Sequence, residues 1–401
     1  MSQGALTRIQ RVAIGKEATL YATPASFTKP RGIEATSMTA AREALADNRQ
    51  LTSRKAQHAA HIGQKSFAFG MTIPMHDNIV DDMGDVFEGA LGSKVSTTAL
   101  VFVSGTQSTI TISSGTFDPL IIITLSDGSR HVRPVKSVAG GTVATLAIQL
   151  PALGGRTVTS VSNALACYKH DPSADVLSFQ IQSDRDQETD QVPYVGKGCA
   201  PLSVGLSLDL TQRLGFSFSF EGGDWLQTVG GDLGDPDGAL SGQYLGYACE
   251  VYVQDISTPS AGVQLEAQTV ALDLAPQTIG RRATRINTSV DNVPGSALVG
   301  WKRGLQFPEP VTMTLTLADS TYITDRDNRV PFGMLLVFSK GTPDSAASNE
   351  RVAVFLPRVV LDAEPTLTDI DGIEGQQLSF RVEEEALAAP YLYQGCLSFF
   401  G

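Results

Sequence analysis

The chain has 401 residues, of which 42% are hydrophobic and 18% are charged, and its formal net charge is −12. This composition excludes an intrinsically disordered protein and allows two or three domains with substantial buried cores. The acidic balance also argues against a protein that grips nucleic acid directly, because such proteins need clustered Lys and Arg.

The N-terminal region is polar and poor in periodic pattern. Residues 1–27 lack the apolar core of a secretion signal and predict an extended arm. Residues 28–62 form a polar stretch, and a connection this long is unusual in a compact domain unless it has a function. The part at 35–62 is either a solvated loop or surface helix, or an arm that contacts a neighbouring subunit. Its candidate contact residues are Arg42, Arg49, Arg54, Lys55 and His58.

A strand and a helix are expected next. Apolar and small or polar residues alternate from Ser66 to Ile73, which predicts a half-buried strand. Asp77 is a suitable N-cap for a following helix, and Gly92 stands where a left-handed C-cap is expected. The apolar residues between them recur at steps of one, three and four and predict one buried helix face. This face consists of Ile79, Val80, Met83, Val86, Phe87, Ala90 and Leu91.

The chain then reads as β-strands. Residues 107–165 predict a small inserted β-subdomain, with turns at Asp127-Gly128 and at Gly140-Gly141. Further on, three phenylalanines alternate with serines, so one strand face is aromatic and the other carries hydroxyl groups. That strand contains Phe216, Ser217, Phe218, Ser219 and Phe220. An aromatic stripe with a period of two is typical of a sheet core.

The order of elements is repeated along the chain. A glycine- and aspartate-rich linker at 228–242 separates a first unit, at 28–106 and 166–227, from a second at 243–385. The alternating strand of the second unit, with Thr312, Thr314 and Thr316, is followed by a polar segment that could form a helix. We therefore predict a mainly β fold, a sandwich or barrel with one short helix per unit. Residues 386–401 are expected to be a C-terminal tail.

The sequence contains no strong motif for metal binding, catalysis or nucleotide binding. His58 and His61 lack further metal ligands at suitable spacing, and the Asp-Gly pairs at 235–238 and 368–372 do not continue into calcium loops. The acidic residues at 184–190 suggest a solvated loop, with a cation site or a channel-facing ring as alternatives. The four cysteines lie far apart and predict free thiols. No nucleotide-binding or nucleophile motif is present, so we expect neither an enzyme nor a cofactor.

In the order of its elements the chain resembles the major tail tube proteins of bacteriophages with long non-contractile tails. The family shows an Arg-containing loop, a glycine lead-in, an alternating strand and an amphipathic helix that ends in glycine. Arg49 and Gln50, then Gly63, and then residues 66–92 stand in these places. Residues 352–384, with Pro357 and Pro365, resemble the closing strands of the family.

The resemblance implies a virion protein that is assembled in the host cytoplasm, without membrane insertion. Its partners are expected to be copies of itself, in stacked rings of three duplicated chains or alternatively of six. Tape measure, tail terminator and distal tail proteins are further partners, and DNA passes through the channel without specific binding. Thr312, Thr314, Thr316, Ser217 and Ser219 are expected to suit the channel wall. The alternatives are a distal-tail, baseplate or terminator ring protein and, from another class, a glycan-binding β-sandwich.

Overall fold

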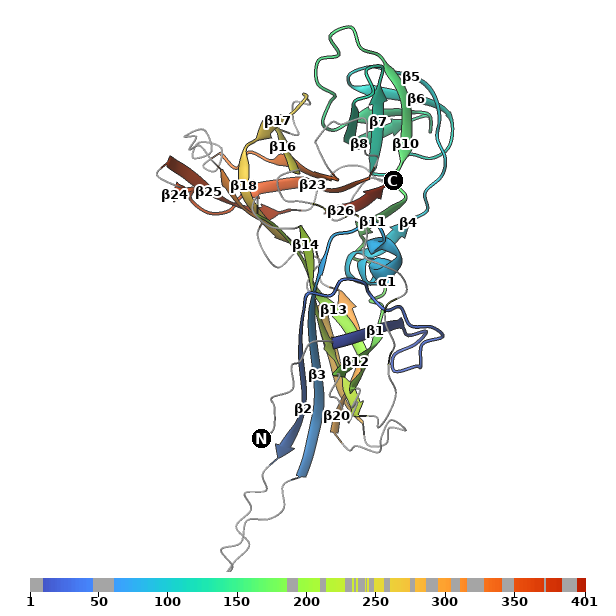
Figure 1. The fold of residues 1–401 in the computed structure, drawn as a ribbon, viewed down its shortest axis with the longest axis vertical. Coiled ribbons are helices and arrows are strands. Elements are labelled where there is room, and N and C mark those ends of the chain that lie inside the picture. Colours follow the sequence, from blue (N-terminus) through green and yellow to red (C-terminus); the bar gives the residue numbers. More distant parts are fainter. Residues whose placement is uncertain are drawn as a thin grey trace, which may run out of the picture.

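A computed structural model shows the architecture. It describes residues 10–45, 61–185, 194–209, 214–227, 249–255, 260–274, 278–285, 295–303, 311–315, 328–340, 350–370, 373–383 and 395–401, and the single residues 233, 236, 242 and 244. In this part of the chain the fold is mainly antiparallel β with one helix, which confirms the predicted fold class. The molecule is elongated: a rounded unit stands at one end, and the hairpin of β2 (Ala35–Leu45) and β3 (His61–Pro74) projects from the other (Figure 1).

Eight strands from both halves of the chain form a continuous antiparallel sheet, which we call the long sheet. In spatial order they are β2, β3, β14 (Gly215–Gly222), β13 (Tyr194–Asp209), β18 (Ala267–Asp273), β21 (Val311–Leu315), β25 (Ile373–Val382) and β24 (Thr366–Ile370). Four come from each half, and each set runs in the order first, second, fourth and third strand along the chain. The pairing of β13 with β18 joins the two sets, so both halves share one sheet.

A second sheet packs against the inner face of the long sheet and is joined to it, because residues 359–361 pair with residues 380–382 of β25. Its strands are β17 (Val263–Leu265), β16 (Cys249–Asp255), β22 (Phe332–Ser339), β23 (Arg351–Leu361), β26 (Cys396–Phe400), β11 (Ala166–His170) and β4 (Gly92–Val95). Every residue of β22 and β26 is buried, because alternate side chains enter different cores. Leu336 belongs to the core shared with the long sheet, whereas Leu335 belongs to a core on the opposite side.

The rounded unit is a six-stranded sheet that nearly closes into a barrel. Its order is β10 (Val158–Asn163), β7 (Leu120–Leu125), β8 (Arg130–Ala139), β9 (Val143–Leu146), β6 (Thr109–Ser114) and β5 (Val101–Gly105). The end strands approach closely, since a Cβ on Gly105 would lie 2.9 Å from the Val158 Cβ. The predicted turns are confirmed: Gly128 has a φ of 85°, and Gly140 and Gly141 have φ values of 57° and 76°.

Smaller elements flank the body on the side of the hairpin. Strand β1 (Gln10–Lys16) pairs with β12 (Phe179–Arg185), and β12 pairs with the N-terminal part of β13. Strand β15 (Asp224–Gln227) pairs with that same part of β13. Strands β19 (Thr278–Arg285) and β20 (Gly295–Arg303) form a separate hairpin. Strand β20 lies against β3 and β19 lies against β13, on the same side of the body as the β2–β3 hairpin (Figure 1).

Helix α1 (Ile79–Leu91) lies over the core beside β11 and β4. Its N-cap is Asn78, whereas the sequence predicted Asp77. The Asp77 carboxylate instead accepts a hydrogen bond of 2.8 Å from the Lys340 ammonium. The predicted C-cap is confirmed, because Gly92 has a φ of 114° and its N–H donates to the Glu88 carbonyl.

Several boundaries differ from the sequence predictions. Residues 10–16 of the predicted extended arm form β1, which pairs with β12, and residues 35–45 form a strand rather than a solvated loop or a surface helix. The barrel begins at Val101, ahead of the predicted 107. Residues 396–400 are not a tail, because β26 pairs with β23 on one side and β11 on the other. The polar segment expected to form a second helix lies outside the described residues.

Candidate assembly surface

The outer side of the long sheet, which we call the open face, is rich in hydroxyl groups. In β14 and β21 buried apolar residues alternate with more accessible polar ones. The strand register places neighbouring polar or small residues in rows: Thr72 faces Ser217, and Ser217 faces Gly205. In the second half, Thr312 faces Ser379 and Thr314 faces Gln377.

Four of the residues that the sequence predicted for the channel wall lie on the open face. They are Ser217, Ser219, Thr312 and Thr314, whereas Thr316 is outside the described residues. A shallow groove of about 450 Å³ crosses the face between β2, β3 and β14, and its lining includes Ser37, Thr39, Ala68 and Ser219. The lining also contains large apolar residues such as Phe69 and one acidic residue, Glu221, so the groove presents no cluster of charges to hold a ligand.

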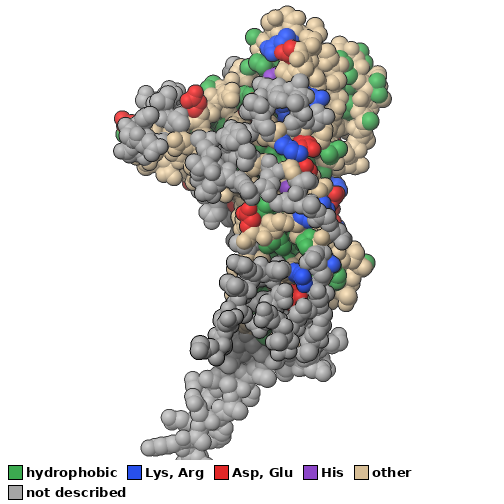
Figure 2. Space-filling model, viewed as in Figure 1, with side chains coloured by type: hydrophobic (Ala, Val, Ile, Leu, Met, Phe, Trp, Pro, Cys, Tyr) green, Lys and Arg blue, Asp and Glu red, His purple; other side chains and the backbone are tan. Residues whose placement is uncertain are grey.

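Charged side chains are few on the described part of the open face, and they include the acidic residues Glu221 and Asp273. The Asp273 carboxylate accepts a hydrogen bond of 2.9 Å from the Val204 N–H. Arg381 lies 3.1 Å from Asp362 and 3.0 Å from Glu383. Elsewhere on the surface, basic and acidic side chains lie close together in small groups (Figure 2). Among the described residues, the open face therefore gives a polyanion no row of cations to bind.

The long sheet ends in a strand edge at each side. In the described part of the chain, β2 pairs only with β3, and β24 pairs only with β25. Leu367 of β24 is 64% exposed. Free edges of this kind are templates for pairing with another chain, and folded proteins usually protect them with charges, proline or a cover. The two edges are therefore candidate contacts between copies, and the sequence pattern did not single them out.

The β2–β3 hairpin has a firmly held base. The Lys65 ammonium lies 3.0 Å from the Asp224 carboxylate, donates to the Trp225 carbonyl at 2.9 Å and sits 5.7 Å from the Trp225 ring. The Trp225 indole N–H donates to the Ala41 carbonyl at 3.0 Å. Of the predicted contact residues, Arg42 lies in β2 opposite Lys65. Arg49, Arg54, Lys55 and His58 lie outside the described residues.

Helix α1 is anchored by aromatic packing. Ile79, Met83, Val86, Phe87 and Leu91 are buried, and Val80 is partly buried against the same core. The Phe87 ring is completely buried and contacts rings from β11, β14 and β26. Their centroid distances are 5.7 Å to Tyr168, 5.1 Å to Phe216, 5.7 Å to Phe218 and 5.3 Å to Phe399. One helix thus ties the long sheet to the second sheet, which includes the C-terminal strand β26.

The second hairpin, β19–β20, docks onto the first half of the same chain. The Arg303 guanidinium donates to the carbonyls of Gly89, at 2.8 Å, and Ala90, at the C-terminal end of α1. A cation is favourable there because the last carbonyls of a helix have no partner within it. The Trp301 indole donates to the Gly198 carbonyl at 2.9 Å. Burial, with the nearby Arg303 charge, lowers the pKa of His170 to about 4, so this imidazole stays neutral.

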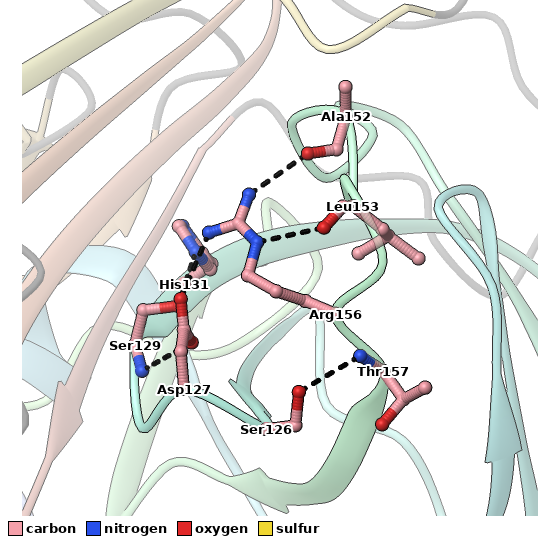
Figure 3. A network of polar contacts seen from close by, with 8 residues as sticks. All are labelled: Ser126, Asp127, Ser129, His131, Ala152, Leu153, Arg156 and Thr157. Carbon is pink, nitrogen blue, oxygen red and sulfur yellow. Dashed lines mark hydrogen bonds and ion pairs between the residues drawn. The ribbon is translucent and has the colours of Figure 1, made fainter.

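A group of Asp, Ser and His at the barrel tip differs from a nucleophilic triad. The Ser129 hydroxyl donates to the Asp127 carboxylate at 2.6 Å, and the His131 ring lies 3.4 Å from that hydroxyl (Figure 3). In a triad the acid orients the histidine instead. Asp127 also accepts from Arg156 at 3.2 Å, and these bonds hold the pKa of its carboxyl at about 2. The network fixes the β7–β8 turn.

Other chemistry is equally sparse in the described residues. They contain no group of three metal-ligating side chains, and no helix among them is long and apolar enough to cross a membrane. All four cysteines are free thiols, as predicted. Burial raises the pKa of Cys199 and Cys249, which disfavours the reactive thiolate. Of the acidic residues at 184–190, Asp184 is buried in β12 rather than solvated.

Comparisons with known proteins do not assign this chain to a family. No protein-family model matches it, and a comparison with curated proteins found no match. The open face, the two free edges and the projecting hairpin are therefore the features on which a function can be argued.

Proposed function

We propose that the chain is a structural virion protein that assembles as stacked rings into the tail tube of a long-tailed bacteriophage. The observation that carries this proposal is the long sheet, with a hydroxyl-rich open face and a free strand edge at each end. Joining these edges from copy to copy closes the long sheets into a barrel and leaves neither of the two edges unpaired. The open face then lines the channel.

The surface chemistry suits a conduit for DNA. Duplex DNA carries one negative charge per roughly 1.7 Å of its length, so a basic wall would hold it by many phosphate contacts. The open face offers neutral hydroxyl groups instead, and the whole chain has a net charge of −12. DNA therefore slides past the wall without specific binding. Before ejection the channel holds the tape measure protein, and terminator and distal tail proteins close its ends.

The repeated strand order supports rings of three chains. Each half contributes four strands to the long sheet in the same order, so a chain counts as two tube units. Three chains then supply six units per ring, and six chains are the alternative. The β2–β3 hairpin projects away from the barrel end of the molecule. Its position suits a connector between rings, and the basic residues Arg49, Arg54 and Lys55 lie between β2 and β3 in the sequence.

Negative-stain electron microscopy of the purified protein at rising concentration tests this proposal. We expect hollow tubes with a regular axial repeat, and top views with three-fold symmetry. Single rings that never stack would favour a terminator, baseplate or distal tail protein. Monomers at every concentration, combined with binding to a glycan array, would favour the glycan-binding alternative and contradict the tube.

A further inference from the structure

The strand registers align the two halves of the chain residue by residue. Phe218, Ser219 and Phe220 of β14 correspond in pattern to Leu378, Ser379 and Phe380 of β25. Ser219 faces Gly70 on β3, and Ser379 faces Thr312 on β21. Gly70 therefore corresponds to Thr312, and the residues that follow them match closely.

The residues after Gly70 and Thr312 agree as well, which supports the alignment independently. Met71 then corresponds to Met313, and Thr72 corresponds to Thr314. Both methionines are buried, at 3% and 1% exposure. Two identical residues in succession, with the same burial, support a duplicated unit beyond its order of elements.

The last strands of the two units, β13 and β24, correspond in the same way. Gly205 faces Ser217, and Thr366 faces Gln377, which is the counterpart of Ser217. Leu206 of β13 therefore corresponds to Leu367 of β24.

The first strands of the two units align in the same way. Ala271 faces Thr312, and Ser37 faces Gly70, so Leu272 of β18 corresponds to Met38 of β2.

The contact between the two halves buries the counterpart of Leu367 against a neighbouring strand, whereas Leu367 itself has a neighbouring strand on one side only in the described sheet. Within the chain, Leu206 pairs with Leu272 where β13 meets β18, and their exposures are only 1% and 6%. Leu367 is the counterpart of Leu206 but is 64% exposed, because no strand follows β24 in the described part of the sheet. Met38, the counterpart of Leu272, lies at the opposite free edge and is only partly buried.

We propose that β24 of one copy pairs with β2 of the next copy in the register that joins β13 to β18. The pairing is antiparallel, with Leu367 facing Met38 and Thr368 facing Ser37. It rests on the proposed ring assembly and names the contact that closes the ring. Residues 35–41 of the β2 edge carry no charged side chain, so nothing there opposes strand addition. The same relation lays the β2–β3 hairpin over the neighbouring copy, as β19–β20 lies over its own first half.

Cysteine pairs test the register. Side chains directly opposite on antiparallel strands have Cβ atoms about 4.5–5.5 Å apart, near enough for a disulfide after a small adjustment. The double variant Met38→Cys with Leu367→Cys should form covalent multimers under mild oxidation, seen on a non-reducing gel. In the matched control, Ser37→Cys with Leu367→Cys, the two thiols point to opposite faces of the sheet. This variant should run as a monomer on the same gel. The single variants measure background from the native thiols.

A charge variant keeps the test independent of cross-linking. Leu367→Lys changes a side chain that is exposed in the free chain. The melting temperature of this variant should therefore equal that of the unaltered protein, whereas its rings and tubes should be lost. Val103→Lys, at a barrel residue that is 57% exposed, should assemble normally. Tubes formed by Leu367→Lys, or tubes of the cysteine pair that do not cross-link, would overturn the pairing and leave the tube function standing. Failure of the unaltered protein to form rings would instead contradict the function.

Discussion

Replacement of Phe87 by alanine gives the sharpest test of how the body is held together. The ring has 0% exposure and contacts four other rings at centroid distances of 5.1–5.7 Å. Truncation of a buried phenylalanine to alanine costs about 3–5 kcal/mol. The surrounding rings come from three strands fixed in two sheets and cannot collapse into the cavity, so we expect a loss of about 4–5 kcal/mol.

The matched control is Val80→Ala on the same helix, where the side chain is only partly buried. We expect it to cost about 1 kcal/mol, because fewer buried methyl groups are removed. Urea unfolding of dilute protein, followed by circular dichroism, measures both. The free energy of unfolding falls by about 3 kcal/mol per M of urea. The midpoint of unfolding of the Phe87 variant should therefore lie roughly 1.5 M below that of the unaltered protein. Equal shifts for the two variants would refute the aromatic cluster as the main anchor of α1.

Two further predictions concern a buried carboxyl group and a glycine. Burial raises the pKa of Asp118 to about 7, so between its ordinary 3.8 and 7 the folded chain holds a proton that the unfolded chain releases. The stabilisation of the folded chain by this protonated carboxyl is complete at low pH, and it falls by up to about 1.4 kcal/mol per pH unit across this window. Asp118→Asn should therefore gain melting temperature relative to the unaltered protein as pH rises from 5 to 8, and a constant difference would contradict this. Gly92→Ala puts a Cβ 2.6 Å from the Asp171 carbonyl, whereas Gly141→Ala meets open space, although both glycines have positive φ. Thermal melting should show a loss of about 1 kcal/mol at Gly141 and clearly more at Gly92, and equal losses would argue against the close contact.

Short-range patterns in the sequence determined the elements of this protein. The steps between apolar residues from Ile79 to Leu91 predicted α1, because one helix face must be buried. The alternation of phenylalanine and serine in β14 predicted both its core face and its hydroxyl face. The pair Asp127-Gly128 predicted a hairpin, since the glycine readily takes a positive φ. These signals are local, so a single chain segment carries each of them.

The arrangement of the strands depended on contacts between distant segments. The sequence indicates neither that β13 pairs with β18 nor that β26 lies between β23 and β11. It also predicted Asp77 as the N-cap, whereas in the fold Lys340 binds that carboxylate. Strand neighbours are selected by how whole faces pack, and a period of two shows that a face is buried without showing what covers it. For the same reason the exposed Leu367 became visible as a contact residue only beside its buried counterpart, Leu206.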